Sequence, residues 1–223
     1  MCSILGCLDY NNSILSLDKF QQVNKLMHRR GPDHSDIKEY FFSDRVLRLG
    51  HNRLSILDLS NHGHQPMTFD DLVIVYNGEV YNFLEIRSDL EKLGYTFVSN
   101  SDTEVILSAY QHWGDACVEH FRGMFAFLIW DVRNQRLFAA RDRLGIKPLY
   151  WSMVGENVIL GSELKTILAS GLIEPVMNYQ ALHHYLTFYS VPPPLTMLEN
   201  VHSLLPGHCL TWEKDTVSVK QYW

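Results

Sequence analysis

The amino-acid sequence predicts an α+β fold in which layered β-sheets are flanked by helices. Two observations support this prediction. Strand-like segments outnumber long helical segments, and the two kinds follow one another in a mixed order rather than in the steady alternation of a parallel α/β fold. With 223 residues, of which 46% are hydrophobic, the chain is long enough for one large domain or two small ones with a full core.

The first half of the chain contains strands and helices separated by clear breaks. Ser3–Leu8 is expected to be a buried strand, and Leu17–His28 a helix, because apolar residues recur there at helical spacing. The Gly31-Pro32 step ends this helix. The other expected elements are strands over 45–49 and 72–76 and helices over 79–93 and 102–113. Ser101 and Glu104 form a capping box at the start of the last of these helices.

The second half contains a predicted hairpin and several short elements. Apolar segments over 124–130 and 136–140 pair around Asn134, and the three prolines over 192–194 make a stiff, extended connector. The remaining expected elements are strands over 157–161, 209–212 and 217–219 and helices over 164–169 and 179–188.

Composition argues against several classes of protein. The net charge of −6 and the pI near 6.0 are atypical of a nucleic-acid groove or of a protein that binds an anionic membrane surface. No apolar run approaches the roughly 20 residues of a membrane helix, and no basic n-region begins a signal peptide. The four cysteines form no CxxC pair or disulfide framework, which indicates a reducing, cytoplasmic compartment.

Cys2 is the first candidate for catalysis. A chain terminus usually frays, so a structural cysteine gains little from this position. Removal of Met1 would give the residue a free α-amine with a pKa of about 7.7–8.0, next to a thiol with a pKa of about 8.5. The partly neutral amine can then accept the thiol proton, so Cys2 would supply both a nucleophile and its base. We therefore expect the active protein to begin at Cys2.

The sequence YNGEVYN places Asn77-Gly78 between two predicted elements. Asn-Gly between apolar runs most often forms a hairpin turn. However, Glu79–Leu93 has helical spacing and is followed by Gly94, which favours a junction between a strand and a helix. Backbone N–H groups at such a helix start would suit a negative charge.

Eight segments occur in the order seen in class II glutamine amidotransferases: MCSILG, RRGPD (29–33), GHNRLSILD (50–58), QP (65–66), YNGEVYN (76–82), SDTEV (101–105), GMFAF (123–127) and RDRLGIKPLY (141–150). More closely, the chain resembles the N-terminal glutaminase domain of glutamine-hydrolysing asparagine synthetases. That closer resemblance includes GSELK (161–165), the VPPPLT connector and LLPGHCL (204–210).

The resemblance implies a fold, a domain division and partners. The fold is a four-layer αββα N-terminal-nucleophile (Ntn) hydrolase sandwich of two antiparallel sheets between helices. Residues 2–190 would form the glutaminase domain, and residues 191–223 a connector and strands leading towards a synthetase domain that the 223 residues lack. The chain would then be a fragment or a subunit beside a separate acceptor protein. ATP and Mg²⁺ belong to that synthetase part, whereas this part needs no metal or organic cofactor. The sequence leaves the oligomeric state open, with a homodimer as one candidate.

The resemblance also assigns catalytic roles. Cys2 would attack the side-chain amide of glutamine and form a γ-glutamyl thioester, which water then hydrolyses. Asn77, through its side-chain amide, and Gly78, through its backbone N–H, would form the oxyanion hole. Glycine allows a close backbone approach, and one such donor can be worth roughly 3 kcal/mol in the transition state.

The same resemblance assigns glutamine binding. Arg53 would grip the α-carboxylate with its planar fork, although a surface arginine is the alternative. Asp102 would receive the α-ammonium, besides serving as an N-cap. Glu79 also belongs to the glutamine site, or is a carboxylate favoured by a helix start. The segment expected to line the pocket is Leu54, Ser55, Ile56 and Leu57.

Two positions depart from the usual motifs. Ser3 follows the nucleophile where many relatives have Gly, and Arg29 replaces the His that usually begins HRGPD, which leaves the contacts of this loop open. Arg141, Arg143 and Lys147 could bind phosphate, but no glycine-rich phosphate loop accompanies them, so a structural role at the hairpin end is preferred.

Histidine pairs raise a metal-binding alternative. His62 with His64, and the His183-His184 doublet, could hold a metal, but no cysteine or carboxylate set accompanies them at zinc-site spacing. We interpret them as loop and helix residues.

The resemblance thus implies an ammonia-producing glutaminase for asparagine biosynthesis. Two alternatives remain open: a glutaminase that feeds a sugar or another carboxylated metabolite, and a non-catalytic relative that keeps the fold.

Overall fold

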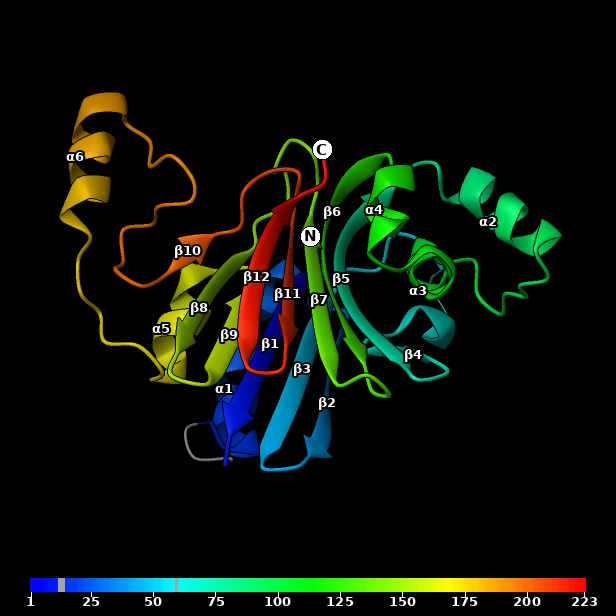
Figure 1. Cartoon of the computed structure of the whole chain (residues 1–223), viewed down its shortest axis with the longest axis horizontal. Coiled ribbons are helices and arrows are strands. Elements are labelled where there is room, and N and C mark those ends of the chain that lie inside the picture. Colours follow the sequence, from blue (N-terminus) through cyan, green and yellow to red (C-terminus); the bar gives the residue numbers. More distant parts are fainter. Residues whose placement is uncertain (12–14, 59) are drawn as a thin grey trace.

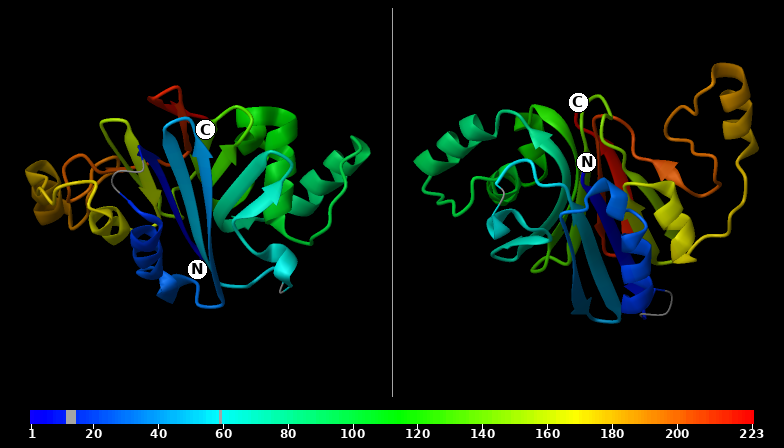
Figure 2. Two further views of the ribbon diagram at one scale, coloured as in Figure 1. Left: turned by 90° about the horizontal axis from the view of Figure 1, so that it is seen from below. Right: turned by 180° about the vertical axis from the view of Figure 1, so that it is seen from behind.

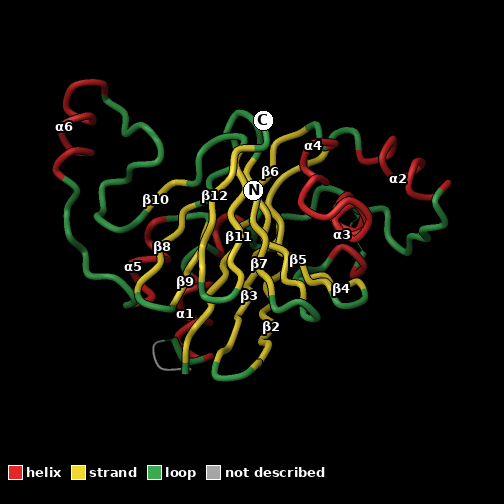
Figure 3. Tube along the Cα trace, in the orientation of Figure 1, coloured by secondary structure: helices red, strands yellow, loops and turns green. Residues whose placement is uncertain are grey.

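The computed structural model describes residues 1–11, 15–58 and 60–223, which form two stacked six-stranded antiparallel sheets (Figures 1 and 3). The first sheet has the order β10 (His202–Ser203), β8 (Tyr150–Val154), β9 (Asn157–Gly161), β1 (Ser3–Tyr10), β3 (Arg45–Arg53) and β2 (His34–Phe42). The second has the order β12 (Thr216–Gln221), β11 (His208–Glu213), β7 (Arg136–Arg141), β6 (Gly123–Asp131), β5 (Leu72–Val80) and β4 (Met67–Phe69).

Side-chain alternation along the strands divides the core into layers. On β1, Ile4 and Leu8 enter the core between the sheets, whereas Leu5 and Cys7 face the opposite side. Trp130 of β6 is almost fully buried in the same inter-sheet core. Because successive residues of a strand point to opposite faces, both sheets have an apolar inner face and an apolar outer face that helices must cover.

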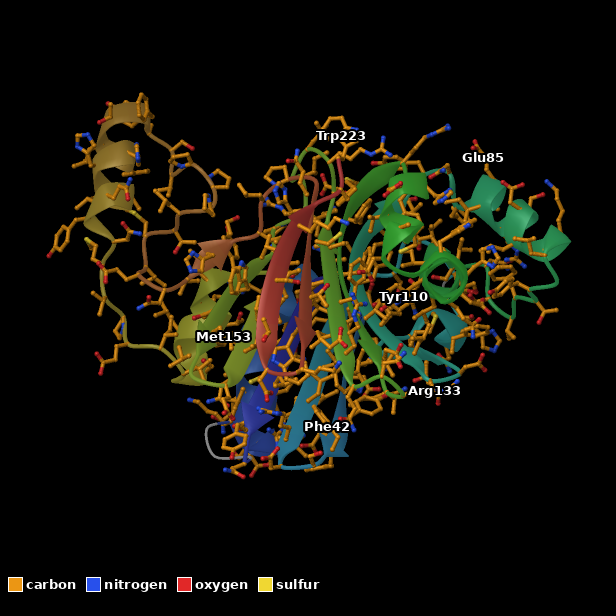
Figure 4. The ribbon with its side chains drawn as sticks, viewed as in Figure 1. Phe42, Glu85, Tyr110, Arg133, Met153 and Trp223 are labelled. Atoms are coloured by element: carbon orange, nitrogen blue, oxygen red, sulfur yellow. The ribbon has the colours of Figure 1, made fainter. Side chains whose placement is uncertain are left out.

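Helices cover both outer faces, which gives four layers (Figure 2). On the first sheet lie α1 (Leu17–Lys25) and α5 (Leu164–Ser170), and on the second lie α2 (Phe83–Lys92), α3 (Asp102–Trp113) and α4 (Cys117–His120). Tyr110 of α3 stacks on Phe138 of β7, and Figure 4 shows it between the helix and the sheet. The helix α6 (Tyr179–Phe188) lies apart from the sandwich in Figures 1 and 2.

The architecture confirms the expected αββα sandwich of antiparallel sheets between helices. Every strand expected from the sequence is present, as are the helices α3, α5 and α6. The residues over 191–223 are woven into both sheets, since β10 pairs with β8 and β11 pairs with β7. Among the described residues, no helix is long and apolar enough to cross a membrane.

The expected junction at Asn77-Gly78 is wrong. The strand β5 continues through both residues to Val80, because Gly78 pairs with Phe125 and Glu79 pairs with Met124 of β6. The following helix begins only at Phe83. Asn77-Gly78 therefore lies inside a paired strand, and no helix start contributes N–H groups there.

Smaller differences concern helix ends and short strands. The helix α1 ends at Lys25, and a separate 3₁₀ turn, η1, spans His28–Arg30. Ser101 caps α3 by accepting the Thr103 amide, but the Glu104 carboxylate accepts instead from the amides of the preceding loop. The strands that were not expected are β2, β4, β8 and β10.

Candidate active site

The two sheets bring their functional residues together through strand alternation. On β3, Leu47 and Leu49 enter the inter-sheet core, so Arg53, at the same parity, lies on the face towards the second sheet. On β5, Val73 and Val75 face the first sheet, and Asn77 continues that series. Cys2 immediately precedes β1. Cys2, Arg53 and Asn77 line one pocket at this end of the sandwich.

Cys2, the candidate nucleophile, is held by contacts to its thiol and to its backbone carbonyl. The Leu54 amide donates a hydrogen bond to the Cys2 Sγ at 3.3 Å, and the thiol faces the Leu54 carbonyl at 3.5 Å. Arg30 donates from Nε to the Cys2 carbonyl at 3.1 Å and pairs with Glu163 at 3.3 Å. Arg29, the residue that departs from the usual motif, is exposed, so this contact does not depend on it.

Burial dominates the electrostatics of this thiol. It raises the pKa of Cys2 above the ordinary value, while the Leu54 amide, the chain's amino terminus, Arg53 and Lys147 act in the opposite direction. A buried thiol therefore needs a nearby base and nearby positive charge to react as a thiolate. The chain described here carries Met1, which lines the pocket, so its free amine belongs to Met1 rather than to Cys2.

Asn77 presents an amide without a partner. Its Nδ2 is buried and has no hydrogen-bond partner among the described residues, which is rare for a buried donor. Gly78 beside it can only be glycine, because a Cβ there would collide with the Met124 carbonyl of β6. The pocket thus contains a preorganised donor at the position predicted for the oxyanion hole.

Arg53 is 4% exposed, and its guanidinium organises the loop that follows β3. Nη1 donates to the Ser60 carbonyl at 3.0 Å, and Nη2 donates to the carbonyls of Leu57, at 3.2 Å, and of Asp58. Gly63 packs against the same guanidinium so closely that a Cβ would collide with it. Arg53 therefore lines the pocket and also shapes its wall, which rules out the surface alternative.

Asp102 lines the pocket as the first residue of α3, so the expectation that it is the N-cap is wrong: the N-cap is Ser101. Its Oδ2 accepts hydrogen bonds from the Tyr76 hydroxyl at 2.7 Å and from the Val80 amide at 3.0 Å. Burial raises the pKa of this carboxyl, although both hydrogen bonds favour the charged form. A buried carboxylate that lines a pocket is suited to a cationic ligand.

The other predicted residues divide into two groups. Glu79, Leu54, Ile56 and Leu57 line the pocket. Ser55 does not: its amide donates to the Asp33 carboxylate at 2.7 Å, which fastens this loop to the segment before β2.

The match to a family model decides which family this architecture and this pocket represent. The model is described as a glutamine amidotransferase domain, and it matches residues 1–223. The chain belongs to the glutamine amidotransferase domain family.

Curated relatives of this amidotransferase domain are much longer than the chain. Asparagine synthetase [glutamine-hydrolyzing] 1 of Bacillus subtilis is 38% identical over 229 residues, which is 100% of this chain and 35% of that protein. A putative asparagine synthetase [glutamine-hydrolyzing] 2 of Methanocaldococcus jannaschii is 36% identical over 241 residues, which is 100% of this chain and 46% of that protein.

A solved structure supports the fold independently. Glutamine phosphoribosylpyrophosphate amidotransferase from B. subtilis matches with a TM-score of 0.71 and 17% identity. The match covers 100% of this chain and 49% of the amidotransferase chain. At this identity the likeness concerns the fold alone, and it agrees with the Ntn-hydrolase sandwich of the amidotransferase domain.

Several pocket residues of the amidotransferase domain were not assigned from the sequence. The buried Gln65 accepts a hydrogen bond from the Tyr76 amide at 2.6 Å and donates one to the Thr103 hydroxyl at 3.2 Å. It therefore links β5 to α3 beside the pocket. Lys147 also lines the pocket, and belongs to the RDRLGIKPLY segment that was interpreted as structural. The QP motif was a sequence signal that could have identified Gln65. No comparable signal identified Lys147, because a charged residue at the end of a hairpin is usually structural.

The histidines of the amidotransferase domain occupy separate environments. His64 stacks on His34 with ring centroids 3.6 Å apart, and His184 stacks on Phe188 within α6. Over residues 1–11, 15–58 and 60–223, no group of three or more His, Cys, Asp or Glu side chains is arranged to hold a metal.

Proposed function

We propose that this domain hydrolyses L-glutamine to glutamate and ammonia through a γ-glutamyl thioester on Cys2. The ammonia would supply an ATP-dependent synthetase domain or subunit that makes asparagine from aspartate. The observation that carries the proposal is the shared pocket, in which the Cys2 thiol and the unpartnered Asn77 amide lie with the buried charges of Arg53 and Asp102.

In the proposed reaction the terminal residue supplies both the nucleophile and the base, and water completes the hydrolysis. After removal of Met1, the α-amine of Cys2 takes the thiol proton, and the sulfur attacks the δ-carbon of glutamine. Asn77 and Gly78 donate hydrogen bonds to the oxyanion. The ammonium then gives a proton to the departing nitrogen, ammonia leaves, and the amine activates the water that releases glutamate.

The charges of the pocket suit an amino-acid zwitterion. Arg53 binds the α-carboxylate, while Asp102 and Glu79 receive the α-ammonium. The apolar wall of Leu54, Ile56 and Leu57 contacts the side-chain methylenes. A zwitterion held in this orientation places its side-chain amide at Cys2, which explains why a small amide substrate would be selected.

The acceptor half is proposed from the resemblance to longer relatives. In this proposal ATP and Mg²⁺ act in that half, and the glutaminase half uses neither. A cytoplasmic location is part of the proposal, supported by four free thiols. The homodimer remains a prediction that no described contact addresses.

The test is glutamate release from glutamine by the purified protein and by Cys2→Ala. We expect the variant to lose turnover while its melting temperature stays close to that of the unmodified protein. Cys209→Ala, which removes a buried thiol outside the pocket, is the matched control and should retain turnover. Full glutaminase activity in Cys2→Ala would refute the mechanism.

A further inference from the structure

Lys147 lines the catalytic pocket, and most of its side chain is covered. It is 5% exposed and lines the same pocket as Cys2 and Glu79. Within the described part of the chain, no hydrogen bond or ion pair reaches its ammonium, whereas Lys165 pairs with Glu163 at 2.6 Å. The ammonium itself is not fully buried, so an unpaired positive charge opens on the pocket.

The fold fixes the backbone of Lys147 on both sides. Its amide donates to Asp142 Oδ2 at 2.9 Å, and its carbonyl accepts from Arg141 Nε at 2.7 Å. The same Asp142 carboxylate also accepts the amides of Leu144 and Ile146, at 3.1 and 2.9 Å. This tight loop holds the Cα in place, so the entry of the lysine side chain into the pocket is built into the fold.

Charged groups from five segments line the pocket or contact the Cys2 backbone. The cations are Arg30 on η1, Arg53 on β3 and Lys147 on the loop after β7, and the acids are Glu79 on β5 and Asp102 on α3. Both arginines make the backbone-carbonyl contacts described above. Among the described residues, Lys147 has no direct hydrogen-bond or ion-pair partner for its ammonium, although the negative charges of Glu79 and of Asp142, on the same loop, act on it without contact.

We propose that Lys147 is a positioning residue whose ammonium sets the protonation of the mature amino terminus. Its positive charge disfavours the protonated α-amine and favours the thiolate, so both groups of Cys2 reach their reactive forms at a lower pH. The inference rests on the proposed function, because it concerns the base and the nucleophile of that mechanism. Burial raises the pKa of the Cys2 thiol, and Lys147 is one of the charges that act against this rise. Burial, followed by Arg30, lowers the pKa of Lys147, against the opposing effect of Asp142 and Glu79.

The first test is the pH profile of kcat/KM for glutamine hydrolysis. In Lys147→Met the acidic limb should move to higher pH by about one unit, the size of effect that a nearby charge exerts on a partly buried group. Lys147→Arg keeps the positive charge, so the acidic limb of its profile should lie at the same pH as in the unmodified protein. Lys92→Met, which removes an exposed lysine on α2, is the matched control and should leave the profile unchanged.

The second test does not require glutamine turnover. The rate of Cys2 alkylation by iodoacetamide is measured against pH, and its midpoint should also rise by about one unit in Lys147→Met. The reaction is selective, because Cys7, Cys117 and Cys209 are buried and the pKa values of Cys7 and Cys209 are raised to about 12.

The two tests separate the two proposals. If the unmodified protein releases no glutamate, the proposed function fails, and the alkylation midpoint still decides the role of Lys147. If glutamine is hydrolysed but both the limb and the midpoint stay fixed in Lys147→Met, the inference about Lys147 is overturned.

Discussion

The Tyr76 hydroxyl donates a hydrogen bond to the Asp102 carboxylate at 2.7 Å, and so joins β5 to the first residue of α3 beside the pocket. The Val80 amide donates to the same oxygen at 3.0 Å. Even with both bonds, burial raises the pKa of Asp102, so the folded protein bears a cost for keeping this group charged. A carboxylate retained at a cost in a pocket is typical of a binding site.

Asp102→Asn should therefore separate stability from binding. The amide oxygen can still accept from Tyr76 and Val80, but the variant cannot form an ion pair with an α-ammonium. We expect KM for glutamine to rise at least tenfold and the free energy of unfolding at pH 7 to increase, because the variant no longer bears the cost of a buried charge. Thermal melts and steady-state kinetics measure the two effects.

The stability gain of Asp102→Asn should depend on pH. The folded-state pKa of Asp102 lies above its ordinary value of 3.8, so the folded protein binds a proton at this site more tightly than the unfolded chain does. The cost of ionisation is fully present above the folded-state pKa and disappears below the unfolded-state value. The melting-temperature difference should shrink as pH falls through this window; a difference that grows on acidification would show that we have misjudged the group.

Asn77→Ala tests the oxyanion hole. The Nδ2 donor has no described partner, so its removal costs the resting fold little, whereas the transition state loses a hydrogen bond. We expect kcat to fall about 100-fold with little change in KM. Asn134→Ala, in the exposed turn between β6 and β7, is the comparison variant. An unchanged kcat in Asn77→Ala would exclude the amide from catalysis.

Arg53→Lys tests carboxylate recognition. Lysine keeps the charge but cannot hold the carbonyls of Leu57, Asp58 and Ser60 with one planar group. KM should rise about tenfold or more, with a smaller effect on kcat. Arg29→Lys changes an exposed arginine of the neighbouring turn and should behave like the unmodified protein. An Arg53→Lys enzyme with unaltered KM would mean that the carboxylate is bound elsewhere.

The layered fold was predictable because its strands and helices have strong local patterns. The segments around Ser3, Asp102 and Tyr179 gave clear strand or helix periods, and the structure has those elements. The strand β2 was missed because its residues are mostly half-exposed or exposed, as expected at a sheet edge, so its sequence has no apolar alternation.

Asn77-Gly78 shows where local patterns failed. An Asn-Gly pair indicates a turn or a junction when only its neighbours in sequence are considered. The pairing with β6, more than 40 residues away, instead extends β5 through it. The partners of Arg53 and the burial of Lys147 could not be predicted either, because they depend on how two loops meet at the end of the sandwich.

The central claim is that the processed amino terminus is the nucleophile. Mass spectrometry after incubation with an electrophilic diazoketone analogue of glutamine tests it most directly, because the analogue should alkylate the attacking sulfur. We predict a mature chain that begins at Cys2 and carries one label on that residue, with glutaminase activity lost in proportion to labelling. An active protein that retains Met1, or a label on another residue, would contradict the account.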